Sequence, residues 1–67
     1  MRKYMKLKAL MYEKEIRQID LAPVIGRGIA YISSRLNGHE PWNCEEMVKI
    51  GELLEIPREK LLEYFLE

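Results

Sequence analysis

The stretch QIDLAPVIGRGIAYISSRLNG, residues 18–38, decides the fold of this chain. Its first part has apolar residues at helical spacing and stops at Gly26, which can adopt a positive φ at no steric cost. Its second part carries apolar side chains every three or four residues before an Asn-Gly pair: Ile29, Ile32 and Leu36. The stretch therefore predicts two short helices, residues 18–25 and 29–36, joined by a glycine-containing turn.

The flanking sequence also predicts helices. Apolar residues recur at intervals of three and four over residues 4–16, and no Gly or Pro interrupts them. Asn43 and Glu46 are spaced as a capping box for a helix that runs to about Glu55, and Pro57 suits the start of a last helix. No segment alternates with period two. We therefore expect an all-α fold of five helices without a sheet.

Pro23 lies inside the first predicted helix of the opening stretch. A proline deep in a helix removes a backbone hydrogen bond at a cost of roughly 3 kcal/mol. We expect Asp20 to cap this helix, so that Pro23 falls in the first turn, where its missing N–H costs little.

The length allows one small domain, which we place over residues 1–67. There is no run of 18 or more apolar residues that could span a bilayer. Lysines interrupt the basic start where a signal peptide needs an apolar segment. A single cysteine, Cys44, excludes an internal disulfide framework and suits a reducing compartment. We expect a cytoplasmic protein.

The formal net charge of zero hides an uneven distribution. Residues 1–38 hold eight Lys/Arg against three Asp/Glu, whereas residues 39–67 hold three against eight. We expect a molecule with a basic end, suited to phosphate, and an acidic end that turns away from it. The alternative is an ordinary solvated surface with chance segregation.

Residues 18–38 also follow a known sequence pattern, Q-x-x-L-A-x-x-x-G-x-x-x-x-x-I-S-x-x-x-N-G. The matching residues are Gln18, Leu21-Ala22, Gly26, Ile32-Ser33 and Asn37-Gly38. On these residues the chain resembles the lambda/434 repressor and Cro-like helix-turn-helix family, also called XRE-type. The carboxy-terminal part, from Glu40-Pro41-Trp42 to Glu63-Tyr64-Phe65, is similar to small phage and prophage repressors of Gram-positive hosts.

The resemblance implies a DNA-binding domain of five helices whose recognition helix, residues 29–36, enters the major groove. The residues that it places toward the bases are Ile29, Ala30 and Ser34. The residues that it places on or near the sugar-phosphate backbone are Gln18, Tyr31, Arg35 and Asn37. Arg27 in the turn and His39 just past the motif add to these candidates, and Gly28 at the start of the recognition helix is a further DNA-binding candidate.

Several of these candidates have a second interpretation. Ile29 is in register with the apolar face of its helix, so it is either core or base-contacting. Ala30 and Ser34 suit helix propensity and solubility as well as base contacts. Arg35 has five donors and a full charge for a guanine or a phosphate. His39 is more simply a loop residue than a ligand.

The chain departs from the family at two places. Gly28 stands where many members have a Ser or Thr that caps the recognition helix, a loss of a few tenths of a kcal/mol. Met11 and Leu36 stand where many members pair an Arg with a Glu. An apolar contact in place of a buried ion pair is often neutral or stabilising.

Catalytic and metal chemistry find little support in the sequence. One His, one Cys and no clustered carboxylates leave neither a zinc site nor a catalytic triad. The glycines at 26 and 28 lack the preceding strand and third glycine of a dinucleotide-binding motif. We expect no enzyme activity, no cofactor and no small-molecule ligand.

The function that we expect is a sequence-specific transcriptional regulator that binds a double-stranded DNA operator as a homodimer. A single motif reads only a short half-site, so two copies are needed. The apolar residues expected at the dimer contact are Leu62, Phe65 and Leu66, with ordinary core as their alternative role. The alternative function is a protein-binding module, such as an antirepressor or an antitoxin-like partner, on the same fold.

Overall fold

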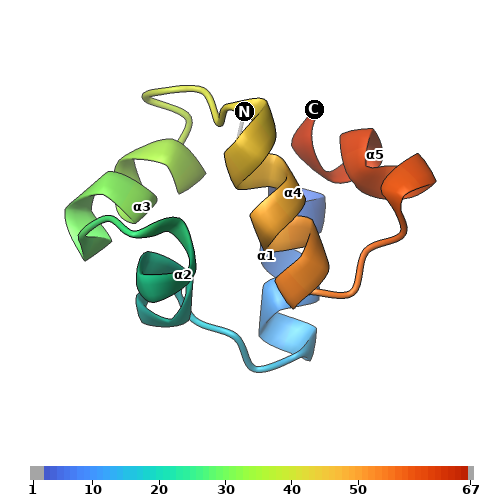
Figure 1. Cartoon of the computed structure of the whole chain (residues 1–67), viewed down its shortest axis with the longest axis horizontal. Helices are drawn as coiled ribbons and strands as arrows, with labels where there is room; N and C mark the ends of the chain where they lie inside the picture. The colour runs from blue at the N-terminus through green and yellow to red at the C-terminus, as the bar shows by residue number, and fades with distance from the viewer. Residues whose placement is uncertain (1–2, 67) are drawn as a thin grey trace.

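The computed structural model describes residues 3–66, and its regular structure is helical throughout this part of the chain (Figure 1). The α-helices are α1 (Met5–Glu13), α2 (Gln18–Ile25), α3 (Ile29–Leu36), α4 (Cys44–Leu53) and α5 (Leu61–Phe65). A 3-10 turn, η1 (Arg58–Lys60), leads into α5. The predictions of an all-α fold and of five helices are confirmed.

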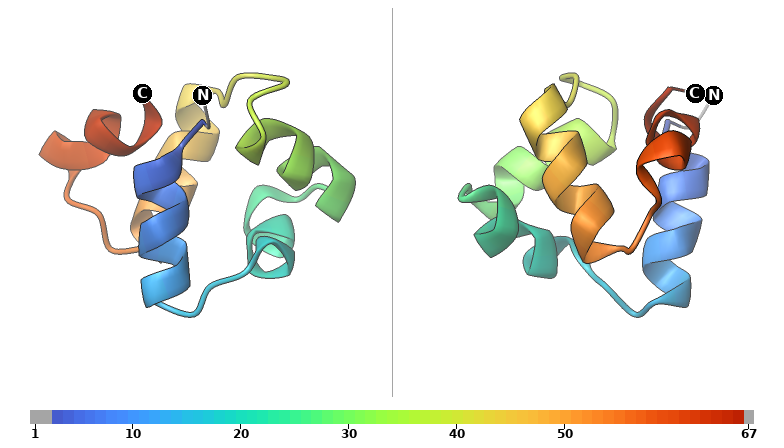
Figure 2. Two further views of the ribbon diagram at one scale, coloured as in Figure 1. Left: turned by 180° about the vertical axis from the view of Figure 1, so that it is seen from behind. Right: turned by 45° about the vertical axis from the view of Figure 1, so that its right-hand side comes forward.

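Helix α4 lies in the middle of the molecule, with α2 and α3 on one side and α5 on the other (Figure 1). The reverse view shows α1 in front of α4 (Figure 2). Helix α2 packs on both α3 and α4, while α5 packs on α4 and α1. The fully buried side chains of the shared core are Leu7, Leu21, Ile32, Leu36, Ile50 and Leu54.

The first four helices end in the same way. A residue with positive φ follows each helix, and the next N–H donates back to a carbonyl five residues earlier, which satisfies an otherwise unpaired helical carbonyl. Glycine takes this position after α2 (Gly26, φ 82°) and α3 (Gly38, φ 83°). Glutamate takes it after α1 (Glu15, φ 58°) and α4 (Glu55, φ 60°). Because these glutamates gave no signal to stop, α1 was predicted to end three residues too late and α4 two residues too late.

The expectation for Pro23 is wrong in detail. Helix α2 begins at Gln18, so Asp20 lies inside the helix, and its Oδ2 accepts a hydrogen bond from the backbone N–H of Arg17 at 2.8 Å. Pro23 is the sixth residue of α2 rather than a first-turn residue. Pro23 has no N–H to donate to the carbonyl of Ile19, so one helical hydrogen bond of α2 is missing.

Three aromatic rings hold α5 against the body of the molecule. Phe65 lies edge-on to Tyr4, with ring centroids 6.3 Å apart, and to Trp42, with centroids 6.4 Å apart. All three side chains are buried. Phe65 therefore fills the core, which corrects the expectation that it contributes to a dimer contact, whereas Leu62 and Leu66 are exposed.

Candidate nucleic-acid interface

The turn between α2 and α3 and the first residues of α3 form a continuous exposed run. Residues 26–30 are all exposed, whereas Ile32 and Leu36 on the opposite face of α3 are buried. The side chain of Ile29 is 51% exposed, so Ile29 is not part of the core. This run therefore presents apolar and cationic side chains, and backbone N–H groups of an uncapped helix start, to solvent.

The other candidates lie around this run. Gln18 is half-buried at the first position of α2, and Ser34 is half-buried one turn along α3 from the exposed Ala30. Asn37 is exposed at the end of α3, where its Nδ2 donates to Ser33 Oγ at 3.3 Å. His39 is exposed in the loop that follows. Helices α2 and α3 pack on each other, and Gln18 lines a hollow together with Leu36, the last residue of α3 before Asn37.

Tyr31 and Arg35 are occupied by contacts within the protein. Tyr31 Oη donates to Oε2 of Glu46, in the first turn of α4. The guanidinium carbon of Arg35 lies 3.6 Å from the centroid of the Tyr31 ring, and Arg35 Nε faces Glu46 Oε1 at 3.8 Å. The Arg35 side chain is only 18% exposed. A contact between Arg35 and DNA would require it to leave this arrangement.

Glu46 is the residue that sequence reasoning missed. Its role in capping α4 was predicted and is confirmed, since Glu46 N donates to Asn43 Oδ1 at 2.8 Å and Asn43 N donates to Glu46 Oε1 at 3.1 Å. Its contacts with Tyr31 and Arg35 carried no local signal, because only the packing of α3 near α4 brings them together. A buried carboxylate is stable only when it is hydrogen-bonded and paired, and Glu46 is both.

The contact with Glu46 changes the pKa of Tyr31. The hydrogen bond from Tyr31 to the Glu46 carboxylate is the largest cause that raises the pKa of the phenol above its usual 10.0, and partial burial adds to it. Ionised Tyr31 would lose this donor and face a negative charge. Tyr31 therefore remains a neutral donor over the ordinary pH range.

Helix α1 supplies two neighbours that sequence reasoning did not assign. Lys8 and Tyr12 line a shallow hollow together with Asn37, and a second hollow together with Gln18. Tyr12 is 88% exposed. The four-residue spacing of these two side chains, each directly after a buried residue of α1 (Leu7 and Met11), was the available signal.

The separation of charge in the sequence is only partly retained in space. Lys6 Nζ lies 3.4 Å from Glu63 Oε1, and Lys14 Nζ lies 3.6 Å from Glu55 Oε1. Basic residues of the first half of the chain thus meet acidic residues of the second half along α1. These two ion pairs neutralise part of the basic charge of the first half of the chain.

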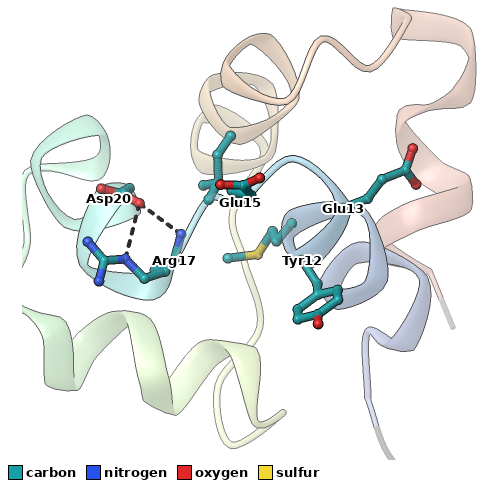
Figure 3. Close-up of a pocket in the computed structure, with 7 residues that line it drawn as sticks. Tyr12, Glu13, Glu15, Arg17 and Asp20 are labelled. Carbon is teal, nitrogen blue, oxygen red and sulfur yellow. Dashed lines mark hydrogen bonds and ion pairs between the residues drawn. The ribbon is translucent and has the colours of Figure 1, made fainter.

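A wider hollow lies where α1 leads into α2, and Figure 3 shows its lining. Arg17 is paired with Asp20 at one end, and Glu13 lies at the other, with Glu15 between them (Figure 3). This lining is net acidic, so it does not suit a phosphate. No group of three His, Cys, Asp or Glu side chains that could hold a metal ion occurs within residues 3–66.

The fold and the surface define a class: a small all-helical domain with an exposed, uncapped helix start beside a glycine turn. The chain belongs to the family described as "Protein of unknown function (DUF739)", whose model matches residues 2–67. A comparison with curated protein sequences finds no match. Across residues 3–66 no helix has the length and apolar character needed to cross a membrane.

Proposed function

We propose that this protein binds double-stranded DNA through a helix-turn-helix formed by α2 and α3, and that it regulates transcription in the manner of a phage or prophage repressor. In this proposal α3 enters the major groove, which is wide enough for an α-helix. The single observation that carries the proposal is the exposed run over residues 26–30, at the start of a helix whose opposite face is buried on α2.

The side chains of this run suit a DNA surface. Ile29 and Ala30 offer apolar contacts for the methyl group of thymine, and Ser34 offers a hydroxyl for a hydrogen bond to a base edge. The N–H groups at the start of α3 are free of side-chain caps, and such groups are suited to phosphate oxygens. Backbone contacts would fix the register, and the few base contacts would give the sequence preference.

The unpaired cations near α3 support the same proposal. Neither Lys8 nor Arg27 has an acidic side chain within ion-pair distance in the described part of the chain. Lys8 shares hollows with Gln18 and Asn37, and Arg27 directly precedes Gly28 at the start of α3. A phosphate that binds there meets a cation that has no competing partner.

A second copy of the chain would complete the operator complex. One α3 can cover only a short half-site, so pairing two copies about one helical turn of DNA apart would supply the affinity and specificity. Leu62 on α5, 56% exposed, and Leu66 just after it, 70% exposed, remain available for such a contact. Sedimentation of the protein with a duplex tests this point, and one chain per duplex at every ratio would rule out the dimer.

The decisive experiment is titration of a fluorescent duplex at about 50 and 200 mM salt. Phosphate contacts release counterions, so we expect the affinity to fall steeply with salt. Gln18→Ala should weaken binding about equally on all sequences, since its proposed contact is a phosphate. Arg58→Ala is a control that removes an exposed charge from η1, which leads into α5 on the other side of α4 from α2 and α3 (Figure 1). Binding that does not depend on salt would instead favour a protein-binding module.

A further inference from the structure

Arg27 occupies an unusual position at the start of α3. It is exposed between Gly26 and Gly28, so the two neighbouring residues give its side chain no lateral support. The guanidinium carbon nevertheless lies 4.9 Å from the centroid of the Tyr31 ring, one helical turn further on. A planar guanidinium over an aromatic face is an attractive arrangement. The ring of Tyr31 is therefore the main support for the Arg27 side chain.

The Tyr31 ring is itself fixed from the protein side. Its hydroxyl is bound to Glu46, which is in turn held by Asn43, and the guanidinium of Arg35 packs against the ring at 3.6 Å. A change of the Tyr31 side chain to another χ1 rotamer would break the hydrogen bond to a buried carboxylate. The orientation of Arg27 thus depends on a chain of contacts that reaches from α4 to the outer edge of α3.

We propose that Tyr31 is a positioning residue that holds the Arg27 guanidinium ready to bind a backbone phosphate of duplex DNA, while Arg35 completes the arrangement without touching the DNA. This inference rests on the proposed DNA binding. A side chain that is already ordered loses less conformational entropy when it binds, and its planar fork matches phosphate oxygens. Tyr31 contributes through Arg27, and not through a contact of its own.

A double-mutant cycle between Arg27 and Tyr31 tests this inference. The probe is a duplex that the parent protein selects from a random-sequence pool. We expect Arg27→Ala to weaken binding roughly tenfold and to reduce the slope of log affinity against log salt by about one. In a Tyr31→Leu background the same change should cost twofold or less. In a Tyr31→Phe background, which keeps the ring, most of the tenfold effect should return.

Arg27→Lys keeps the test decisive if Tyr31→Leu does not fold. Lysine retains the charge but not the planar group that packs on the ring. We expect a severalfold loss of affinity with an unchanged salt slope, whereas equal binding by the Lys variant would overturn the positioning role. A Tyr31→Leu variant that folds and leaves the Arg27→Ala effect undiminished would overturn it too.

Two further variants separate the remaining outcomes. Arg58→Ala removes one charge from η1, beside α5, and should leave the salt slope nearly unchanged. If Arg27→Ala behaves like Arg58→Ala, Arg27 binds no phosphate and the inference fails. If Arg35→Met lowers the salt slope by about one, Arg35 touches DNA and its assignment is overturned. If the parent protein binds no duplex at low salt, the proposed function itself fails.

Discussion

The first turns of α3 and α4 are built in opposite ways. Helix α4 begins with Asn43, which exchanges side-chain hydrogen bonds with the buried Glu46. Helix α3 begins with Gly28, which has no side chain to cap the helix, and Ile29 is half-exposed beside it. One helix start is closed within the protein, and the other is left open to solvent.

The difference teaches that the capped start of α4 contributes to stability, whereas the uncapped start of α3 leaves groups available for binding. N-terminal N–H groups need acceptors, and a capped start is worth about 1 kcal/mol. The cap stabilises the start of α4, and Glu46 also accepts a hydrogen bond from Tyr31 and forms an ion pair with Arg35. Helix α3 forgoes a cap and obtains its order from burial of Ile32 and Leu36. The open start is thus supported by the closed one, through Tyr31 and Glu46.

The largest effect is expected from breaking the closed start at Glu46. Glu46→Ala leaves Arg35 as a largely buried charge without its partner and removes the acceptor for Tyr31, so we expect the free energy of unfolding to fall by about 3 kcal/mol. Urea denaturation measures it. Glu46→Gln, which keeps the size and an acceptor oxygen, should lose less.

Glu45→Ala is the matched control for this prediction. Glu45 also lies in the first turn of α4 but is exposed, so its loss should change the unfolding free energy by about 0.5 kcal/mol or less. Equal effects of the two alanine variants would show that the contacts of Glu46 with α3 contribute nothing to stability.

A smaller effect is expected from removing the cap itself. Asn43→Ala deletes the acceptor for Glu46 N–H, and we expect a loss of about 1 kcal/mol in the free energy of unfolding. Asn43→Asp retains the acceptor and should restore most of it. Thermal unfolding of the three proteins checks the order, and an Asp variant as unstable as the Ala variant would contradict the capping role.

Adding a side-chain cap at the start of α3 should raise the free energy of unfolding, whereas the preceding variants lower it. Gly28 has φ −74° and ψ 167°, which any residue can adopt, and a Cβ there would meet no atom within 4 Å. Gly28→Ser therefore adds a cap without a clash, and we expect a gain of a few tenths of a kcal/mol in stability. If the start of α3 binds phosphate, the same variant should bind DNA more weakly, because its hydroxyl competes for the N–H groups. A less stable Ser variant would contradict this account.

The sequence predicted the starts of α3 and α4 but not all of the helix ends. The bounds of α2 and α3 were predicted to the residue, because glycines mark both ends of the turn region and Gly38 follows α3. The ends of α1 and α4 were placed too late, because Glu15 and Glu55 adopt the left-handed conformation that normally favours glycine. A local pattern cannot reveal a helix end that depends on non-local packing.

The same limit applies to the candidate site. The capping box of α4 is a local pattern, and the sequence predicted it. Tyr31 and Arg35 are four residues apart on α3, so their proximity was also foreseeable, whereas Arg27 lies in the turn before the helix. The contact between Tyr31 and Glu46 spans fifteen positions and two helices, and it depends on the tertiary fold. The role of Arg35 within the protein was therefore missed, and Arg35 was instead expected at the DNA surface.

The smallest effect is expected from pH, and it isolates the hydrogen bond that joins the two starts. The pKa of Tyr31 is raised by its bond to Glu46, so above pH 10.0 the unfolded chain releases this proton while the folded protein keeps it. When the unfolded state binds fewer protons, stability falls as pH rises. The contribution of Tyr31 to stability is therefore complete below pH 10.0 and is lost progressively above it.

Urea denaturation at about pH 8 and pH 11 tests this prediction, and the unfolding free energy of Tyr31→Phe should depend less on pH than that of the parent. Tyr12→Phe, at an exposed tyrosine, should retain the parent's dependence. If all three proteins lose stability equally between these two pH values, the bond from Tyr31 to Glu46 does not link α3 to α4 in solution.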